Sequence, residues 1–234
     1  MKHLILLLLS FCLSLVAHAE HKIESEVNSQ ITGGNTNFKS QLFKIKHEKS
    51  YTDRFALSEA ASYQYGESDE VRSLEKWLIN VRPEFKLTDS TSLFLSTSYS
   101  SNRFSGVDRL LTNDLGVSHI WIKGKKLTLS NSFAYRYSRE KQIDGTKKND
   151  SFAEIGLESS YKFNDNSELT LSMKYLPNFS DSEDDELTAD FDIVTFLGKG
   201  FSFKAGYDWK YDGKPAAGKG KHDYTTTVGL IFKY

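Results

Sequence analysis

The main pattern along the chain is an alternation of apolar and polar side chains with a period of two. In the segment 167–177, every odd position from 169 to 175 is apolar and every even position from 168 to 174 is polar or charged. Successive side chains of a strand point to opposite faces, whereas helical spacing would scatter these charges around a cylinder. The segment is therefore predicted to be a β-strand with one apolar face.

Runs of this kind recur along the chain and are separated by clusters of glycine, asparagine, aspartate and serine. A tilted strand needs about 9–11 residues to cross a bilayer, and the runs suit that length. We expect an all-β fold, a transmembrane antiparallel β-barrel of about 12 strands. The predicted strands are 23–32, 38–48, 54–65, 75–87, 92–102, 110–123, 127–138, 151–163, 167–177, 187–197, 201–211 and 224–234.

Three places break the pattern. Glu59 falls on the apolar face of 54–65, and 110–123 has no clean apolar face. Pro83 lies inside the predicted strand 75–87, although a closed barrel has no edge strand on which its missing N–H would be harmless. A bulge would restore the alternation in the first two strands, and we expect a bulge or a local kink at Pro83.

The connections between the predicted strands alternate in length. The short connections are 50–53, 88–91, 124–126, 164–166 and 198–200, and the longer ones are 66–74, 103–109, 139–150, 178–186 and 212–223. Outer-membrane barrels have short periplasmic turns and longer outer loops, so both chain termini are predicted to lie on the periplasmic side. The connection 33–37 is a short exception, and its two glycines suit a tight hairpin.

The last strand carries an aromatic residue at the very end of the chain. Val228, Leu230, Phe232 and Tyr234 share one face of it. An apolar closing strand with a terminal aromatic is typical of outer-membrane barrels. We interpret these residues as the signal that the barrel assembly machinery reads. Other aromatic side chains lie near predicted strand ends, where their rings suit the headgroup level of a bilayer.

The first nineteen residues read as a targeting segment. Lys2 is followed by an apolar run over 4–16 and by the small-x-small sequence of residues 17–19. We expect 1–19 to be a cleaved signal peptide and 20–234 to form the barrel domain in a bacterial outer membrane. Cys12 is the only cysteine, so the barrel domain has no disulfide or zinc-thiolate site.

Composition excludes some functions and leaves two alternative folds. The chain has 30 basic and 31 acidic residues and a formal net charge of −1, which does not favour nucleic acid as a partner. Beyond the leader, the sequence has no apolar run of the length that a spanning helix needs. A barrel shows lipid only alternate residues, so low mean hydropathy is compatible with it. The alternatives are a soluble β-sandwich and a soluble periplasmic ligand-binding barrel.

If the apolar faces contact lipid, the opposite faces carry the charges. In one interpretation these charges line a narrow water-filled pore, and in the other they pair into a network that fills the lumen. Twelve strands lie between the filled eight-stranded barrel and the open porin, so both interpretations stay open. The lumen-facing candidates are Lys44, Lys76, Arg82, Glu84, Arg136, Glu154, Glu158, Lys162, Lys204 and Asp208.

Catalytic and metal-binding signals are weak. His119 is the one plausible base for an outer-membrane lipid-modifying enzyme, but no serine motif accompanies it. We therefore expect no catalytic residue, no cofactor and no structural metal. The acidic side chains of one outer loop could hold divalent cations, although a solvated loop is the simpler interpretation. These residues are Asp181, Glu183, Asp184, Asp185 and Glu186.

Three segments of the chain resemble one known family. They are ITGGNT at 31–36, NRFSGVDR at 102–109 and YDGKPAAGKGKHDYTTTVGL at 211–230. Together they resemble the salt-induced outer-membrane protein family, which is defined by domain of unknown function 481. The resemblance covers nearly all of 20–234 and implies an outer-membrane β-barrel with no catalytic residues to carry over.

We therefore expect a small pore, or a structural barrel that serves the envelope under salt or osmotic stress. The alternatives are the lipid-modifying enzyme and the soluble binding barrel. The expected partners are outer-membrane lipids, lipopolysaccharide and the barrel assembly machinery. Lys147, Lys148, Lys214, Lys219 and Lys221 are candidates for contacts with lipopolysaccharide phosphates.

Overall fold

A computed structural model describes residues 21–32, 38–215 and 220–234 of the chain. The expected signal peptide 1–19 and the expected hairpin connection 33–37 lie outside these segments. None of the helical structure in the described segments is long and apolar enough to cross a membrane.

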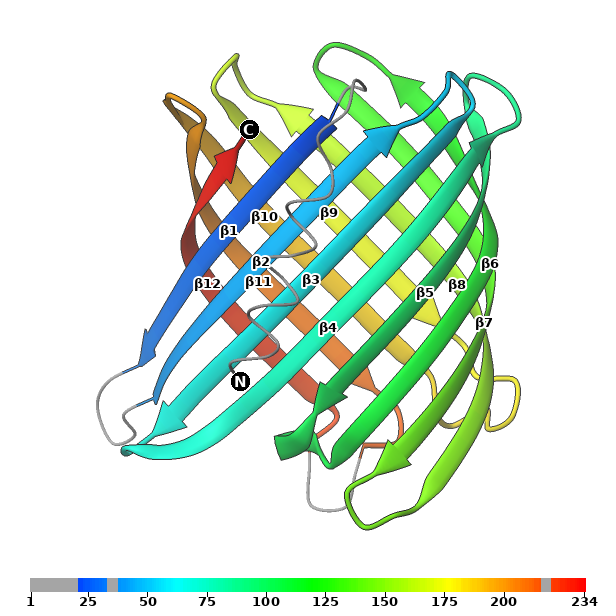
Figure 1. Cartoon of the computed structure of the whole chain (residues 1–234), viewed down its shortest axis with the longest axis vertical. Coiled ribbons are helices and arrows are strands. Elements are labelled where there is room, and N and C mark those ends of the chain that lie inside the picture. The colour runs from blue at the N-terminus through cyan, green and yellow to red at the C-terminus, as the bar shows by residue number, and fades with distance from the viewer. Residues whose placement is uncertain (1–20, 33–37, 216–219) are drawn as a thin grey trace.

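The described residues form twelve β-strands and one short 3₁₀ helix, η1 (Arg103–Ser105). The strands run obliquely around a single wall (Figure 1). They are β1 (His21–Thr32), β2 (Phe38–Ser50), β3 (Phe55–Ser68), β4 (Val71–Lys86), β5 (Thr91–Asn102), β6 (Val107–Lys123), β7 (Leu127–Gln142), β8 (Lys147–Lys162), β9 (Ser167–Leu176), β10 (Glu186–Gly198), β11 (Phe201–Asp212) and β12 (His222–Lys233).

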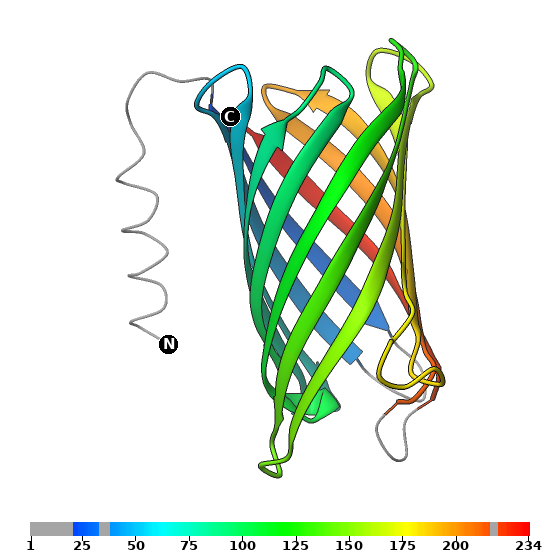
Figure 2. The ribbon, with the colours of Figure 1, turned by 90° about the vertical axis from the view of Figure 1, so that its right-hand side faces the viewer.

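The sheet closes on itself. Each strand pairs antiparallel with its sequence neighbours, and β1 pairs with β12. Ile23 N and Tyr234 O are 3.0 Å apart and Tyr234 N and Ile23 O 2.9 Å apart, so the first and last strands meet at the same end of the barrel. Figure 2 shows the wall from the side. The fold is thus the twelve-stranded closed barrel that the alternation predicts, and all twelve predicted strands are confirmed.

The short connections 51–54, 87–90, 124–126, 163–166 and 199–200 lie together at the end that holds Tyr234, which we call the turn end; the opposite end is the loop end. Two predicted long connections at the loop end are wrong. The predicted connection 66–74 is mostly strand, and the turn is made by Asp69 and Glu70, both with positive φ. Likewise 139–150 shortens to a turn through Gly145, because β7 and β8 extend beyond their apolar segments.

Burial follows the alternation. The side chains on one face of each strand point into the barrel and include most buried polar residues, whereas the other face carries exposed apolar residues. The outward set lies mid-strand all around the wall, with examples such as Leu115 and Phe133 at 57% exposure. A soluble monomer rarely exposes a continuous apolar surface of that extent. The outer surface is therefore suited to lipid.

The three exceptions in the pattern have different outcomes. At Pro83 a bulge or a local kink is expected; the structure has no bulge there, because pairing between β4 and β5 is interrupted from Arg82 to Pro83 and resumes in the same register. Glu59 also stays in register, so no bulge turns it inward; it pairs with His47 on the outer face. In β6 the expected irregularity is confirmed, since register shifts occur between Val107 and Arg109 and between Ile120 and Ile122.

Candidate functional site: the lumen of the barrel

All ten charged residues predicted to face the lumen share the inward side of their strands. The strand register shows this, because residues that stand opposite each other on neighbouring strands share one face of the sheet. Glu26 is buried inside the barrel, and Lys44 stands opposite it. Lys204 stands opposite Gly229, which lies on the same face. The structure then divides the ten residues into two groups. Some are held in buried ionic networks, and others face open space.

The first network is centred on Arg136 in β7. Its Nε donates to Asp114 Oδ1 over 2.6 Å, and its second guanidinium nitrogen lies 2.9 Å from Asp114 Oδ2 and 2.7 Å from Glu154 Oε2. Lys174 Nζ lies 3.1 Å from the other oxygen of Glu154. The carboxylate side chains are 5% and 4% exposed, so their charges are stabilised by these partners and not by water. The network ties four consecutive strands, β6 to β9, together.

The second network closes the seam between the chain ends. Lys204 Nζ in β11 lies 3.2 Å from Glu26 Oε1 in β1 and 2.8 Å from Asp192 Oδ2 in β10. Lys44 reaches the same Glu26 oxygen at 3.7 Å, and Asn28 donates to it at 2.5 Å. These contacts span β10, β11, β1 and β2, with β12 between. The network therefore stabilises the place where a closed sheet must join its first and last strands.

Two inward glycines leave room for the second network. A Cβ on Gly229 would lie 1.8 Å from Asn28 Oδ1, and a Cβ on Gly206 would lie 2.3 Å from Asp192 Oδ1. Real Cβ atoms do not approach other atoms so closely, so the side chains of the network occupy the space above a bare backbone. Glycine occurs at these two strand positions because side chains of the network lie close to the backbone, and not because the chain turns there.

The predicted pair Arg82 and Glu84 lies on β4, 3.5 Å apart. The Arg82 guanidinium sits 3.8 Å from the ring centroid of Phe94, whose side chain is 1% exposed. Gly116 lies beneath that ring, since a Cβ there would be 2.7 Å from Phe94 Cζ. An aromatic ring under a guanidinium is a favourable cation–π contact. Arg82 is thereby held against the wall of the lumen.

Several other lumen-facing charges form no ion pair within the described segments, among them Lys76, Glu158, Lys162, Asp190 and Asp208. Asp190 and Asp208 stand directly opposite each other on β10 and β11. Like charges in that position destabilise a sheet unless water or counter-ions screen them. Ionised side chains without partners are compatible with a lumen that holds water.

Exposure along the inner wall supports the same conclusion. Leu78 faces inward beside Ser62 and is 37% exposed, and the side chains of Lys44, Lys174 and Lys210 are 43%, 38% and 42% exposed. Much of the remaining wall is lined by small side chains. These are Ser58, Ala60, Ser62, Ser92, Ser96, Ser98, Ser118, Ser130, Ser132 and Ala134. The lumen is therefore packed by charged side chains on some strands and left open by small ones on others.

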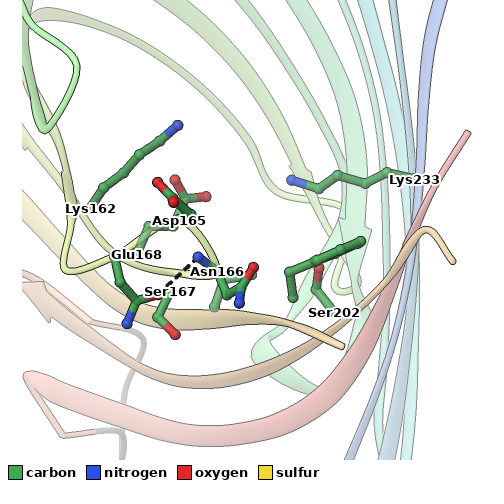
Figure 3. A pocket seen from close by; sticks show the side chains of 10 residues that line it. Lys162, Asp165, Asn166, Ser167, Glu168, Ser202 and Lys233 are labelled. Atoms are coloured by element: carbon green, nitrogen blue, oxygen red, sulfur yellow. Dashed lines mark hydrogen bonds between the residues drawn. The ribbon is translucent and has the colours of Figure 1, made fainter. Parts of the chain in front are cut away.

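At the turn end the wall is hollowed by a pocket of about 210 Å³, formed by the β8–β9 turn, β10, β11 and the end of β12. Lys162 and Lys233 extend toward it from opposite sides, with Asp165 and Glu168 between them (Figure 3). Lys233 Nζ is paired with Glu24 at 3.1 Å. The turn itself is held by Asn166 N, which donates to Asn164 Oδ1 at 2.8 Å.

At the loop end, the predicted acidic cluster is largely neutralised. Lys148 Nζ lies 2.5 Å from Asp184 Oδ2, and Lys214 Nζ donates to Asp181. The hydrogen bond from Lys214 holds the pKa of the Asp181 carboxyl below its ordinary value. No three acidic or histidine side chains in the described segments come together as a metal site. The loop is organised as an ion-paired structure.

The histidine considered as a catalytic base lies on the outer face. His119 Nδ1 is 2.9 Å from Thr91 Oγ1, and its ring packs edge-on against Trp121 with centroids 4.7 Å apart. Trp121 donates to Asn131 Oδ1 at 2.7 Å. The partner hydroxyl is a threonine on the rim of the turn end. This arrangement is typical of an amphipathic aromatic belt.

The four residues of the predicted assembly signal also face outward. Val228 and Leu230 are about half exposed, and the Phe232 ring packs against Phe201 with centroids 4.9 Å apart. Tyr234 is 88% exposed at the turn end. The apolar face that the sequence assigns to the closing strand is therefore available on the outer surface.

Two lumen residues were missed by sequence reasoning. Asp114 is the main partner of Arg136, but the predicted strand 110–123 had no clean face because its register shifts twice. Phe94 is apolar and was assigned no role, although it lies on the inner face under Arg82. The sequence does contain an indication for Asp114. It lies two residues from both Thr112 and Gly116, so the three share one strand face, and small residues such as these suit the inner face.

The fold and the lined lumen together define a twelve-stranded β-barrel of the kind found among outer-membrane proteins. The chain belongs to the family described as protein of unknown function, DUF481, whose model matches residues 26–234. No curated protein matches the chain significantly.

Solved structures similar to the chain share its architecture at low sequence identity. The translocator domain of the autotransporter NalP from Neisseria meningitidis is 13% identical, with a TM-score of 0.55 and coverage of 100% of this chain and 95% of that one. The NanC porin is 12% identical, with a TM-score of 0.58 and coverage of 92% and 100%. An outer membrane channel from Pseudomonas putida F1 is 10% identical, with a TM-score of 0.57 and coverage of 94% and 97%. At such identities the likeness establishes the fold alone.

Proposed function

We propose that the protein is a narrow water-filled pore of the Gram-negative outer membrane, without catalytic activity. The observation that carries this proposal is the open inner wall: Leu78 and Lys44 face the lumen at mid-height and remain accessible to water. An unpaired charge inside a filled lumen would be strongly unfavourable, whereas water solvates it in a pore. The similar porins and channel support the proposal through their shared architecture.

The outer surface supports a location in the outer membrane. The exposed apolar belt would contact outer-membrane lipid, and its aromatic rim would lie at the headgroups. The exposed face of Val228, Leu230 and Phe232 would be recognised by the barrel assembly machinery, after export directed by residues 1–19. Lysines of the loop end such as Lys147 would contact lipopolysaccharide phosphates. A contribution to salt or osmotic tolerance is consistent with a pore that lets small solutes equilibrate.

The test is planar-bilayer recording of the refolded barrel. The proposal expects stepwise currents with a small unitary conductance. A barrel that inserts, as shown by heat-modifiable gel migration, yet never produces steps would overturn the pore.

That outcome would favour the second candidate, a structural barrel whose lumen is closed by its ionic networks. The observation that favours this candidate is that Asp114, Glu154 and Lys204 are deeply buried. Their side chains and partners occupy part of the cross-section of the lumen.

A further inference from the structure

The inner wall of β7, β8 and β9 contains a second recess of about 230 Å³, nearer to mid-lumen than the pocket at the turn end. Its inward side chains are five hydroxyls and one carboxylate, and we call it the hydroxyl recess. These residues are Thr128, Ser130, Glu158, Ser160, Thr170 and Ser172. Strand register places them side by side, because Ser130 and Ser172 flank Glu158 and Thr170 is opposite Ser160.

Glu158 is a charge without an ionic partner in the described chain. The nearest lysine along the neighbouring strand is Lys174, which is one diagonal position away but turns to Glu154 at 3.1 Å. Lys162 lies four residues further along β8, roughly 13 Å at the rise of a strand. Glu158 therefore presents a free carboxylate to the lumen, surrounded by groups that cannot neutralise it.

The hydroxyls define what such a recess recognises. Each serine or threonine hydroxyl can donate one hydrogen bond and accept others, whereas a carboxylate only accepts. A ligand that fits must therefore offer several donors to Glu158 and mixed donors and acceptors to the ring of hydroxyls around it. A protonated amine beside hydroxyl groups meets both requirements, and a charge-assisted hydrogen bond to Glu158 would be the strongest contact.

We propose that the hydroxyl recess binds small solutes that carry an ammonium group and several hydroxyls, such as amino sugars, on their way through the lumen. The proposal deepens the proposed pore function and rests on it. The volume of the recess is several times the roughly 30 Å³ that one water occupies in the liquid, which suits a single sugar-sized molecule. The pocket nearer the turn end combines Lys162 and Lys233 with Asp165 and Glu168, so the two hollows differ in charge.

Three probes of nearly equal size and different charge test the proposal in planar bilayers: glucosamine, glucose and gluconate. The measured quantity is the concentration of each probe that halves the current through a single pore. We expect glucosamine to act at the lowest concentration, glucose next and gluconate last. Glu158→Gln keeps the shape of the side chain and should weaken glucosamine about tenfold, to the level of glucose.

Two further variants separate the recess from general effects. Thr170→Val removes one hydroxyl at constant shape, and we expect it to weaken glucose and glucosamine alike. Glu70→Gln, a matched change in an exposed turn at the loop end, should leave all three probes unchanged. Equal potency of glucosamine and glucose, greatest potency of gluconate, or an unchanged response in Glu158→Gln would each overturn the proposal.

The failure of the pore and the failure of the recess are distinguishable. If the inserted barrel shows no current, the pore function fails, and binding is then measured by calorimetry on the refolded barrel in micelles. Glucosamine binding that Glu158→Gln weakens would still support the recess, whereas absence of binding would overturn it as well.

Discussion

Replacing Arg136 by methionine should destabilise the barrel more than any other single change to a charged side chain of β6 to β9. The substitution keeps much of the side-chain volume but removes three hydrogen bonds, of 2.6, 2.9 and 2.7 Å, to two carboxylates. Asp114 and Glu154 are 5% and 4% exposed, so water cannot take the place of the guanidinium. Breaking a buried ionic group in this way costs about 3–5 kcal/mol.

The free energy of unfolding can be measured by urea titration of the barrel in phospholipid vesicles, followed by the fluorescence of its three tryptophans. The matched control is Arg103→Met in the exposed η1 turn, which should change the free energy by less than about 0.5 kcal/mol. Combining Arg136→Met with Asp114→Asn should recover most of the loss, because Glu154 keeps Lys174 as its partner at 3.1 Å and no buried carboxylate is left without a cation. If Arg136→Met behaved like Arg103→Met, the argument from buried charge would be refuted.

Three further changes test other parts of the structure. Gly229→Ala would place a Cβ 1.8 Å from Asn28 Oδ1, so the seam must shift, and we expect a loss of about 1–3 kcal/mol in the same urea titration. Phe232→Ser removes an outward aromatic of the closing strand, and we expect less heat-modifiable barrel in the membrane fraction of expressing cells. The pKa of Asp181 is lowered by its hydrogen bond with Lys214, so the stabilisation it provides is complete above the ordinary carboxyl pKa, near 3.8, and is lost as the pH falls below it. Pepsin should therefore cut the β9–β10 loop faster as the pH is lowered from 4.5 to about 2.5, relative to a peptide standard.

Each of these predictions has a control. Gly220→Ala adds a Cβ whose nearest neighbour, His222 O, is 4.0 Å away, and should be nearly neutral, so equal losses at 220 and 229 would contradict the clearance argument. If Phe232→Ser assembled as well as the parent chain, the closing strand would not be a recognition element for assembly. Pepsin should cut the loop of Lys214→Gln at pH 4.5 as fast as it cuts the parent chain at low pH. An unchanged rate of cleavage would show that the ion pair does not hold the loop.

The fold could be predicted from the sequence because every strand of a membrane barrel alternates between a lipid-facing and a lumen-facing side chain. A period of two is present in most segments, and one face must be apolar wherever lipid is expected. The number of such segments predicts the strand count, and the parity of Arg136 and Lys204 within their segments predicts that they face inward. The strand ends were less predictable. Residues 66–74 and 139–150 are polar and turn-like in composition, yet they extend the strands, because ladder hydrogen bonds form without an apolar face.

The pairing within the lumen could not be predicted from the sequence. Which carboxylate meets Arg136 depends on the register of β6 and β7, and register shifts in β6 hide the parity of Asp114. Pro83 was expected to cause a bulge or a local kink, and a local gap in one ladder is enough to accommodate the missing donor without a bulge. Glu59 was placed correctly on the apolar face, and its partner His47 explains how that position is tolerated.

Cysteine modification tests the water-filled lumen most directly, because the barrel beyond Cys12 has no native thiol. Ser62 faces the lumen opposite Leu78, and its neighbour Ala61 faces outward opposite Ile79. In Ser62→Cys pores, a charged, water-soluble thiol reagent should react within seconds and reduce the single-pore current. In Ala61→Cys pores the same reagent should leave the current unchanged. Equal behaviour of the two variants, or no reaction at Ser62→Cys in the folded barrel, would contradict the account.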